Sequence, residues 1–233
     1  MAPAVIYIVR HGETNANKGG IMQGQLDTIL NSNGLAQAEL VANALQNVKF
    51  DMAFCSDLSR AVKTAEIIIQ YHPAVQLQKV EALRERVREK PSRYLLYLHS
   101  SRQQHMGDLQ GLIYTPEAMT MHKDTIEKTP DFQGRAVQWW NALLQQLASL
   151  PAQEQPHNVL VVSHGGWIQT LVHTLEGSRK LTVAKGVSMG MGCLNVSITA
   201  IETDGGRKGK LIRYGDVSHL IAKAVASNVD ELP

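Results

Sequence analysis

The sequence has very little cysteine and no long hydrophobic run. Its only cysteines are Cys55 and Cys193, which form neither a CxxC pair nor a zinc-ligand spacing. This scarcity argues against a disulfide framework and favours two inert thiols in a reducing compartment. No stretch approaches the roughly 18 apolar residues of a membrane span. The N-terminal segment also lacks the basic region of a secretory signal. We therefore expect a cytoplasmic protein without a membrane anchor.

The sequence also lacks a strong excess of charge of either sign. Lys and Arg number 23 and Asp and Glu number 21, which leaves a net charge of +2. Such a small charge provides no overall field for recruiting nucleic acid or an anionic membrane. A chain of 233 residues can bury a core without disulfides and still form one domain. We expect a single domain over residues 1–233, and the sequence leaves open whether it forms a homo-oligomer.

Apolar runs of strand and helix type alternate along the chain. The predicted strands lie at residues 4–9, 52–55, 75–80, 159–162, 193–201 and 210–214, and the predicted helices at 35–45, 60–70, 132–150 and 167–175. Such alternation predicts an α/β fold, a three-layer sandwich with a mainly parallel central sheet and helices on both faces. Residues 87–131 show less regular patterning and are expected to form a small insert and cap.

Two histidines directly follow predicted strands. His11 comes after the first apolar run, His164 comes after the strand at 159–162, and a glycine follows each. Ligands in such folds bind beyond the carboxyl ends of parallel strands. We therefore expect the two imidazoles to lie at the same edge of the sheet.

Three interpretations of this histidine pair compete. Metal binding would need a third ligand at a suitable spacing, and none is evident. A purely structural role suits a lone histidine better than two that share the same context. Covalent phosphoryl transfer fits a neutral imidazole, which is nucleophilic near pH 7 because its ordinary pKa is about 6.5. The cations that this chemistry requires are available in Arg10 and Arg60, and arginine can hold phosphate oxygens bidentately. We favour this third interpretation.

The run RHGETNAN at residues 10–17 resembles the signature of the histidine phosphatase superfamily, the phosphoglycerate mutase-like enzymes. The resemblance continues in order along most of the chain. Its further blocks are Gln23-Gly24 with Asp27, Leu30, Gly34, Gln37 and Ala38, then residues 56–65, 83–86, 107–111, 163–166 and 216–220. A single RHG tripeptide would be weak evidence, but ordered blocks at suitable spacing make a chance match very unlikely.

The resemblance implies a role for each matching residue. His11 would be the phosphorylated nucleophile, and Glu85 would protonate the leaving oxygen. The residues that it implies at the phosphate are Arg10, Asn17, Gln23, Gly24, Arg60, His164 and Gly165. Glu13 is a weaker candidate for the acid, because a solvated or structural carboxylate explains it as well. No metal and no organic cofactor is implied.

The chain departs from the family pattern at residues 87–104, which separate the block that contains Glu85 from the Gly-Asp-Leu-Gln-Gly block. Two explanations remain open: a retained intron that preserves the reading frame, or a substrate loop whose arginines bind phosphates. The insertion follows almost directly after Glu85. Since small displacements of a catalytic group can greatly reduce a rate, the placement of this carboxylate is an open question.

The resemblance leaves the phosphoryl acceptor undecided between water and a second substrate hydroxyl. Residues 112–131 lack the Arg-Arg, proline-rich cap stretch that we expect of a glycolytic mutase. A short cap favours an open pocket and water as the acceptor. We therefore expect a phosphatase acting on small phosphorylated metabolites. The alternatives are mutase-type transfer, and a catalytically impaired member that binds phosphorylated ligands.

Overall fold

The computed structural model describes residues 3–86, 111, 127–151, 153–190, 192–206 and 208–221. The insertion at 87–104 and most of the expected cap lie outside these described residues. The two explanations of the insertion, and the argument from a short cap, therefore stay predictions.

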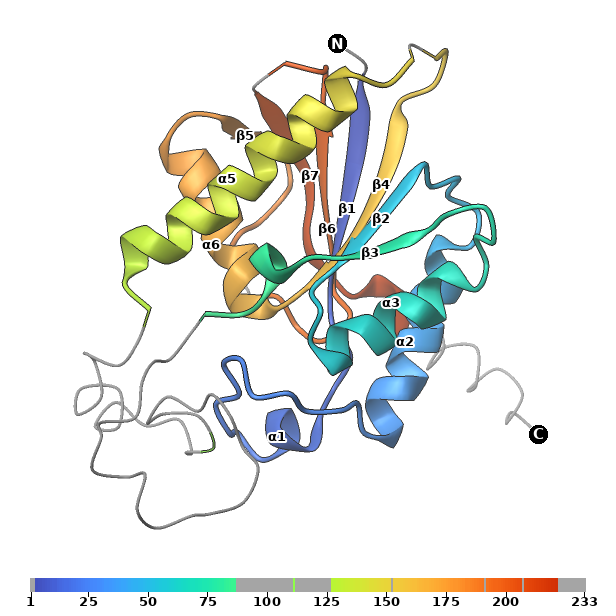
Figure 1. Cartoon of the computed structure of the whole chain (residues 1–233), viewed down its shortest axis with the longest axis vertical. Helices are drawn as coiled ribbons and strands as arrows, with labels where there is room; N and C mark the ends of the chain where they lie inside the picture. The colour runs from blue at the N-terminus through green and yellow to red at the C-terminus, as the bar shows by residue number, and fades with distance from the viewer. Residues whose placement is uncertain are drawn as a thin grey trace.

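A seven-stranded sheet forms the centre of the described structure, with strand order β3-β2-β4-β1-β6-β7-β5 (Figure 1). Its strands are β1 (Ala4–Arg10), β2 (Met52–Cys55), β3 (Leu77–Lys79), β4 (His157–Ser163), β5 (Leu181–Val183), β6 (Ile198–Thr203) and β7 (Gly209–Asp216). The pairs among β3, β2, β4 and β1 are all parallel, whereas β6 runs antiparallel to both β1 and β7. The expected α/β fold with a mainly parallel sheet is confirmed.

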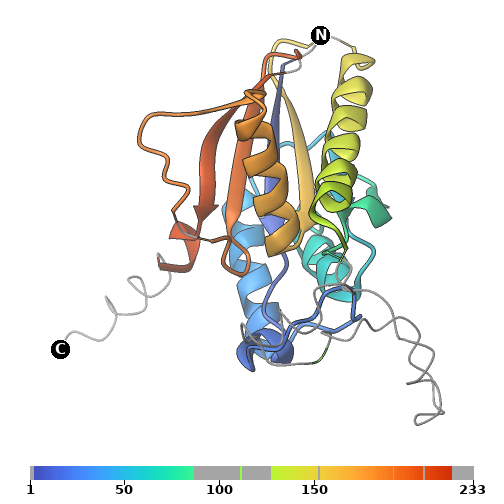
Figure 2. The same ribbon diagram turned by 90° about the vertical axis from the view of Figure 1, so that its left-hand side faces the viewer.

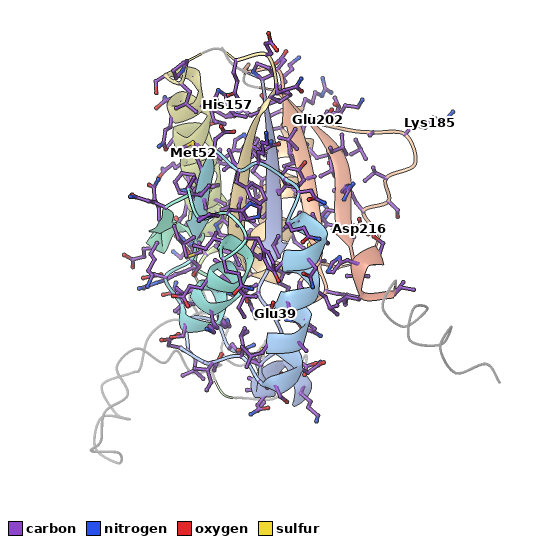
Figure 3. All side chains as sticks on the ribbon, turned by 90° about the vertical axis from the view of Figure 1, so that its right-hand side faces the viewer. Glu39, Met52, His157, Lys185, Glu202 and Asp216 are labelled. Carbon is purple, nitrogen blue, oxygen red and sulfur yellow. The ribbon has the colours of Figure 1, made fainter. Side chains whose placement is uncertain are left out.

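Helices cover both faces of this sheet. They are α1 (Asn15–Lys18), α2 (Ser32–Leu45), α3 (Ser59–Ile69), the 3-10 turn η1 (Glu81–Leu83), α5 (Thr129–Ala148) and α6 (Gly165–Gly177). Helices α5 and α6 lie in front of the sheet in Figure 2, and α2 lies in front of it in Figure 3, which is drawn from the opposite side. The structure is thus the expected three-layer sandwich.

The alternation of side chains along the central strands produces two hydrophobic cores. Ile6 and Ile8 of β1 pack in the core with α5 and α6, whereas Val9 packs with α2 and α3. In β4, Val161 joins the first core and Val162 the second. Successive side chains of a strand point to opposite faces, so strands that are apolar throughout can be buried between two helical layers.

Two predictions about strands were wrong in detail. Strand β6 begins at Ile198 rather than at residue 193, because Val196 has a positive φ of 53° and the chain turns there. An extended strand cannot pass through that backbone conformation. The sequence analysis also missed β5, since three residues are too short to show an alternating pattern.

Two glycines allow the loop after β1 to pack directly on the start of α2. A Cβ on Gly12 would lie 2.5 Å from the carbonyl oxygen of Gly34, and a Cβ on Gly34 would lie 2.0 Å from that of Glu13. Asn31 caps α2 by accepting a hydrogen bond of 2.7 Å from the Gly34 N–H, and it also donates to Glu13 Oε1 at 2.8 Å. These contacts fix the backbone on either side of Gly12, next to His11.

We predict that Gly34→Ala destabilises the protein by about 1–3 kcal/mol, the usual cost of overpacking a closely packed site. The added methyl group would collide with backbone atoms, which cannot rotate away. The matched control is Gly134→Ala in α5, where nothing lies within 4 Å of the new Cβ. That substitution should stabilise by up to about 1 kcal/mol because alanine favours helix. Urea unfolding of both variants tests this, and equal stabilities would contradict it.

Candidate active site

Parallel pairing of β1 and β4 brings the two histidines together. Arg10 is in register with Ser163, and the next residue, His11, donates its backbone N–H to the Ser163 carbonyl at 2.9 Å. The imidazole centroids of His11 and His164 are 5.1 Å apart, and both side chains are buried. The structure thus places the two rings at one edge of the sheet, as the strand ends predicted.

The hydrogen bonds of His11 determine which ring nitrogen carries the proton. Its Nδ1 lies 2.7 Å from the carbonyl oxygen of Gly12. A carbonyl can only accept, so Nδ1 must be the donor and, in the neutral ring, Nε2 carries the lone pair. Nε2 lies 3.3 Å from Nε of Arg60, which donates to it. The lone pair of His11 is therefore directed toward the guanidinium group of Arg60.

Burial and neighbouring positive charge keep both imidazoles neutral. Burial is the main cause that lowers the pKa of His11 well below its usual value, followed by the charges of Arg60 and Arg10. The pKa of His164 is likewise lowered, first by burial and then by Arg60. His164 Nε2 lies 2.9 Å from the Ser56 hydroxyl, which fixes its ring. At neutral pH the lone pair of His11 is thus available for nucleophilic attack.

Arg60 extends from the first turn of α3 into the buried end of the site. It donates to the carbonyls of Leu26 and Gly24 at 2.7 and 2.9 Å, in addition to its contact with His11. Burial lowers its pKa to about 10, so the guanidinium stays charged at neutral pH. Asp27 holds the start of the same helix, since its carboxylate accepts hydrogen bonds from the backbone and hydroxyl of Ser59.

Arg10 contributes a second buried guanidinium. Its NH1 donates to the Cys193 carbonyl at 2.7 Å, and its buried Nε has no hydrogen-bond partner among the described residues. Burial lowers its pKa, while the charge of Glu85 opposes that shift. A Cβ on Gly165 would lie 3.3 Å from Arg10 Nε. The glycine after His164 therefore leaves room for this side chain.

Two amide side chains that follow β1 in the chain, Asn17 of α1 and Gln23 after it, face the same space. Thr14 caps α1, and its backbone N–H donates to Asn17 Oδ1 at 3.2 Å while its hydroxyl donates to Gln23 Oε1 at 2.9 Å. With both amide oxygens engaged, the NH2 groups of Asn17 and Gln23 are the groups that can donate to an anion.

Glu85 lies at the N-terminus of α6. One carboxylate oxygen accepts from the Gly166 N–H at 2.9 Å, and the other accepts from the Arg86 N–H at 2.8 Å. A Cβ on Gly166 would lie 2.5 Å from Glu85 Oε1, so the second glycine after His164 makes room for the carboxylate. The structure thus brings Glu85 to the histidine site, despite the insertion that begins two residues later.

A pocket of about 380 Å³ joins these groups. Its lining residues are Arg10, His11, Asn17, Ile21, Met22, Gln23, Gly24, Arg60, Glu85, Arg86, Phe132, Gly166, Gln169 and Thr170. Two predicted site residues, His164 and Gly165, are not part of this lining. His164 contacts the Ser56 hydroxyl, and Gly165 lies next to the Arg10 side chain. The pocket volume is typical of sites for small molecules.

Sequence reasoning missed several lining residues. Gln169 and Thr170 follow His164 by one to two turns of α6, a spacing that could have indicated them once the helix was placed at the site. Arg86 adjoins the proposed acid but received no role. Phe132 comes from α5 and carried no sequence signal, because only the tertiary fold brings it to the pocket.

The remaining sequence expectations concern Glu13, metals and membranes. Glu13 accepts a hydrogen bond from Asn31, and this hydrogen bond is the main cause that lowers its pKa. It does not line the pocket and serves as a structural carboxylate.

Within the described ranges, no group of three His, Cys, Asp or Glu side chains could hold a metal ion. No helix in that part of the chain is long and apolar enough to cross a membrane.

The fold and the pocket define an α/β protein in which two arginine side chains lie beside a pair of histidines. A family model for the histidine phosphatase superfamily (branch 1) matches residues 6–216. A probable phosphatase of Schizosaccharomyces pombe is 29% identical over 220 residues, covering 92% of this chain and 94% of its own. A metal-independent phosphoserine phosphatase of Arabidopsis thaliana is 30% identical over 232 residues, with coverages of 92% and 82%.

The solved structures agree with this assignment at the level of the fold. The crystal structure of a phosphoglycerate mutase from Bacillus anthracis superposes with a TM-score of 0.72 at 22% identity, covering 94% of this chain and 96% of that one. The chain belongs to the histidine phosphatase superfamily, as the family match over nearly its whole length shows.

The buried neutral histidines predict a specific loss of stability in acid. In the unfolded chain a histidine takes up a proton as the pH falls through about 6.5, whereas His11 and His164 resist protonation in the fold. Below that pH the unfolded state binds more protons, so stability falls by up to about 1.4 kcal/mol per pH unit for each histidine. Above it, their contribution is constant.

This prediction can be checked by urea unfolding at several pH values from 7.5 to 5.5. His11→Gln and His164→Gln each remove one of the two groups, so each should make the acid-side slope shallower than in the parent protein. Curves that run parallel to the parent curve would show that these histidines do not carry the effect.

Proposed function

We propose that this protein is a phosphatase that hydrolyses small phosphomonoesters through a phosphohistidine at His11. The observation that carries the proposal is the lone pair of a buried, neutral His11 directed toward Arg60 inside the pocket. Three features of that arrangement suit the chemistry: a fixed tautomer, a suppressed pKa, and a permanent positive charge at the point of attack.

In the first step His11 Nε2 would attack the phosphorus of the bound ester. The N–P bond forms as the ester P–O bond breaks, and the bonding electron pair leaves with the alkoxide oxygen. Glu85, in its protonated form, would donate its proton to that oxygen, so that a neutral alcohol departs. The Arg60 Nε–H, now 3.3 Å from His11 Nε2, would turn to a phosphoryl oxygen.

In the second step water would attack the phosphohistidine. Glu85, now a carboxylate, would take a proton from this water while the water oxygen bonds to phosphorus. The P–N bond breaks and returns its electron pair to Nε2, which regenerates neutral His11 and releases inorganic phosphate. No electrons are exchanged with a cofactor, and side chains of this chain supply each proton transfer.

The surrounding donors would hold the phosphoryl group during both steps. Arg10 and Arg60 would carry the charge, and the NH2 groups of Asn17 and Gln23 would donate to the equatorial oxygens. The backbone around Gly24 would line the pocket on the same side of the phosphoryl group as Asn17 and Gln23. Gly165 would leave space for Arg10. His164 lies against the His11 ring, where it would orient the nucleophile and complete the oxygen site.

The relatives support hydrolysis, since curated names among them include phosphatases and a phosphatase that is metal-independent. We propose accordingly that this chain needs neither metal nor organic cofactor. We also propose one domain over residues 1–233, because a single sheet includes strands from Ala4 to Asp216. The cytoplasmic location and the absence of nucleic-acid partners stay predictions from composition.

The first test is hydrolysis of a panel of phosphomonoesters in buffer containing EDTA. We expect turnover without added metal, and rapid quenching should trap a phosphoenzyme that is labile in acid and stable in alkali. His11→Ala should lose the label and at least about 10³-fold in rate, since removing a nucleophile leaves only binding and electrostatic effects. The exposed His173→Ala is the matched control and should retain both.

The alternatives predict different outcomes of the same experiment. Mutase-type transfer would pass the label from the phosphoenzyme to an added hydroxyl acceptor more often than to water. A catalytically impaired member would bind phosphate but hydrolyse nothing on the panel. Unchanged hydrolysis in His11→Ala would contradict the phosphohistidine itself.

A further inference from the structure

Arg135 of α5 binds the backbone of the segment that contains Glu85. Its NH1 donates to the carbonyl oxygens of Ala82 and Arg84 at 2.9 and 2.8 Å. Its NH2 donates to the carbonyl oxygen of Glu85 itself at 3.3 Å. One guanidinium group thus contacts three carbonyls within four consecutive residues.

The guanidinium of Arg135 is itself held in place from both sides. Glu127 accepts from its Nε at 3.3 Å and from its NH2 at 3.0 Å, a two-point ion pair in which both side chains are largely buried. The Phe132 ring lies beneath it, 4.9 Å from the guanidinium carbon. An arginine fixed by a carboxylate and an aromatic ring is a rigid anchor rather than a mobile surface group.

The segment from residue 82 to 85 depends on such side-chain donors because it lies outside the sheet. Trp167 Nε1 donates to the Ala82 carbonyl at 2.9 Å, and Ser163 Oγ donates to that of Leu83 at 2.7 Å. Gln25 adds a donor to the Glu85 carbonyl at 3.2 Å. Among these donors, only Arg135 contacts more than one carbonyl of the segment. It is also the donor that connects the segment to α5.

We propose that Arg135 is a positioning residue that fixes Glu85 relative to His11 and thereby sets the efficiency of proton transfer to the leaving group. The inference rests on the proposed function, because it assumes that Glu85 acts as the proton donor. Arg135 does not line the pocket, so it acts through the backbone of Glu85 and not through the substrate.

The planar, five-donor form of the guanidinium is what this role requires. Lysine carries a single ammonium group and cannot reach three carbonyls and a carboxylate in fixed directions. Loss of this anchor would let the Glu85 carboxyl shift, and a displacement of about 1 Å can cost about 10²-fold in rate.

The test compares two substrates that differ in their need for a proton donor. An alkyl phosphate releases a poor leaving group that must be protonated, whereas p-nitrophenyl phosphate releases a stable phenolate without one. The value of kcat/KM reports the steps up to release of the alcohol or phenol, so it isolates phosphoenzyme formation. It is measured for the parent chain, Arg135→Gln, Arg135→Lys and Glu85→Gln.

We expect Arg135→Gln to lower kcat/KM for the alkyl phosphate by about 10- to 100-fold and that for p-nitrophenyl phosphate by less than about 3-fold. Arg135→Lys should show the same substrate dependence with a smaller loss, and it supplies the measurement if the glutamine variant folds poorly. Adding Arg135→Gln to Glu85→Gln should cause little further loss, because the two changes remove the same proton transfer. The exposed Arg213→Gln is the matched control and should leave both substrates unaffected.

A loss of equal size for both substrates would overturn the proposal, since it would indicate general damage to the pocket. No loss for either substrate would overturn it as well, as would additive effects in the double variant. Failure of the proposed function is distinguishable: the parent chain would then hydrolyse neither substrate and form no phosphoenzyme, before any variant is compared.

Discussion

The site depends on the burial of two guanidinium groups beside two neutral imidazoles at one edge of the sheet. Burying a charge is costly unless it is paired and hydrogen-bonded, and the lowered pKa values of Arg10 and Arg60 reflect that cost. Backbone carbonyls compensate for part of it, and the charge of Glu85 opposes part of the shift. In the proposed function, an entering phosphate would supply the missing negative charge.

The rest of the fold maintains this arrangement through close backbone approaches. The register of β1 with β4 places His11 beside Ser163, and the two glycines that follow His164 lack side chains that would crowd functional groups. Gly165 gives room to Arg10, and Gly166 gives room to Glu85. These two glycines therefore matter because they leave space for neighbouring side chains, and not because they relieve backbone strain.

The sequence predicted those parts of the site that follow from strand ends. His11 and His164 each end a strongly apolar run, and parallel pairing then brings them together. Glu85 was found only through the resemblance, because the segment around it has no regular pattern. Phe132 and Arg135 could not be predicted, since their roles arise where α5 packs across the chain. The start of β6 was misplaced because Leu194, Val196 and Ile198 alternate with polar residues, as the residues of a strand do.

The nucleophile and the proposed acid are thus supported by different parts of the structure. The sheet register and the packing of α2 hold His11, whereas α5, α6 and a set of side-chain donors hold Glu85. These supports all precede residue 87 or follow residue 126. Function often varies in loops on a fixed scaffold. Here the contacts that hold His11 and Glu85 belong to the scaffold of strands and helices.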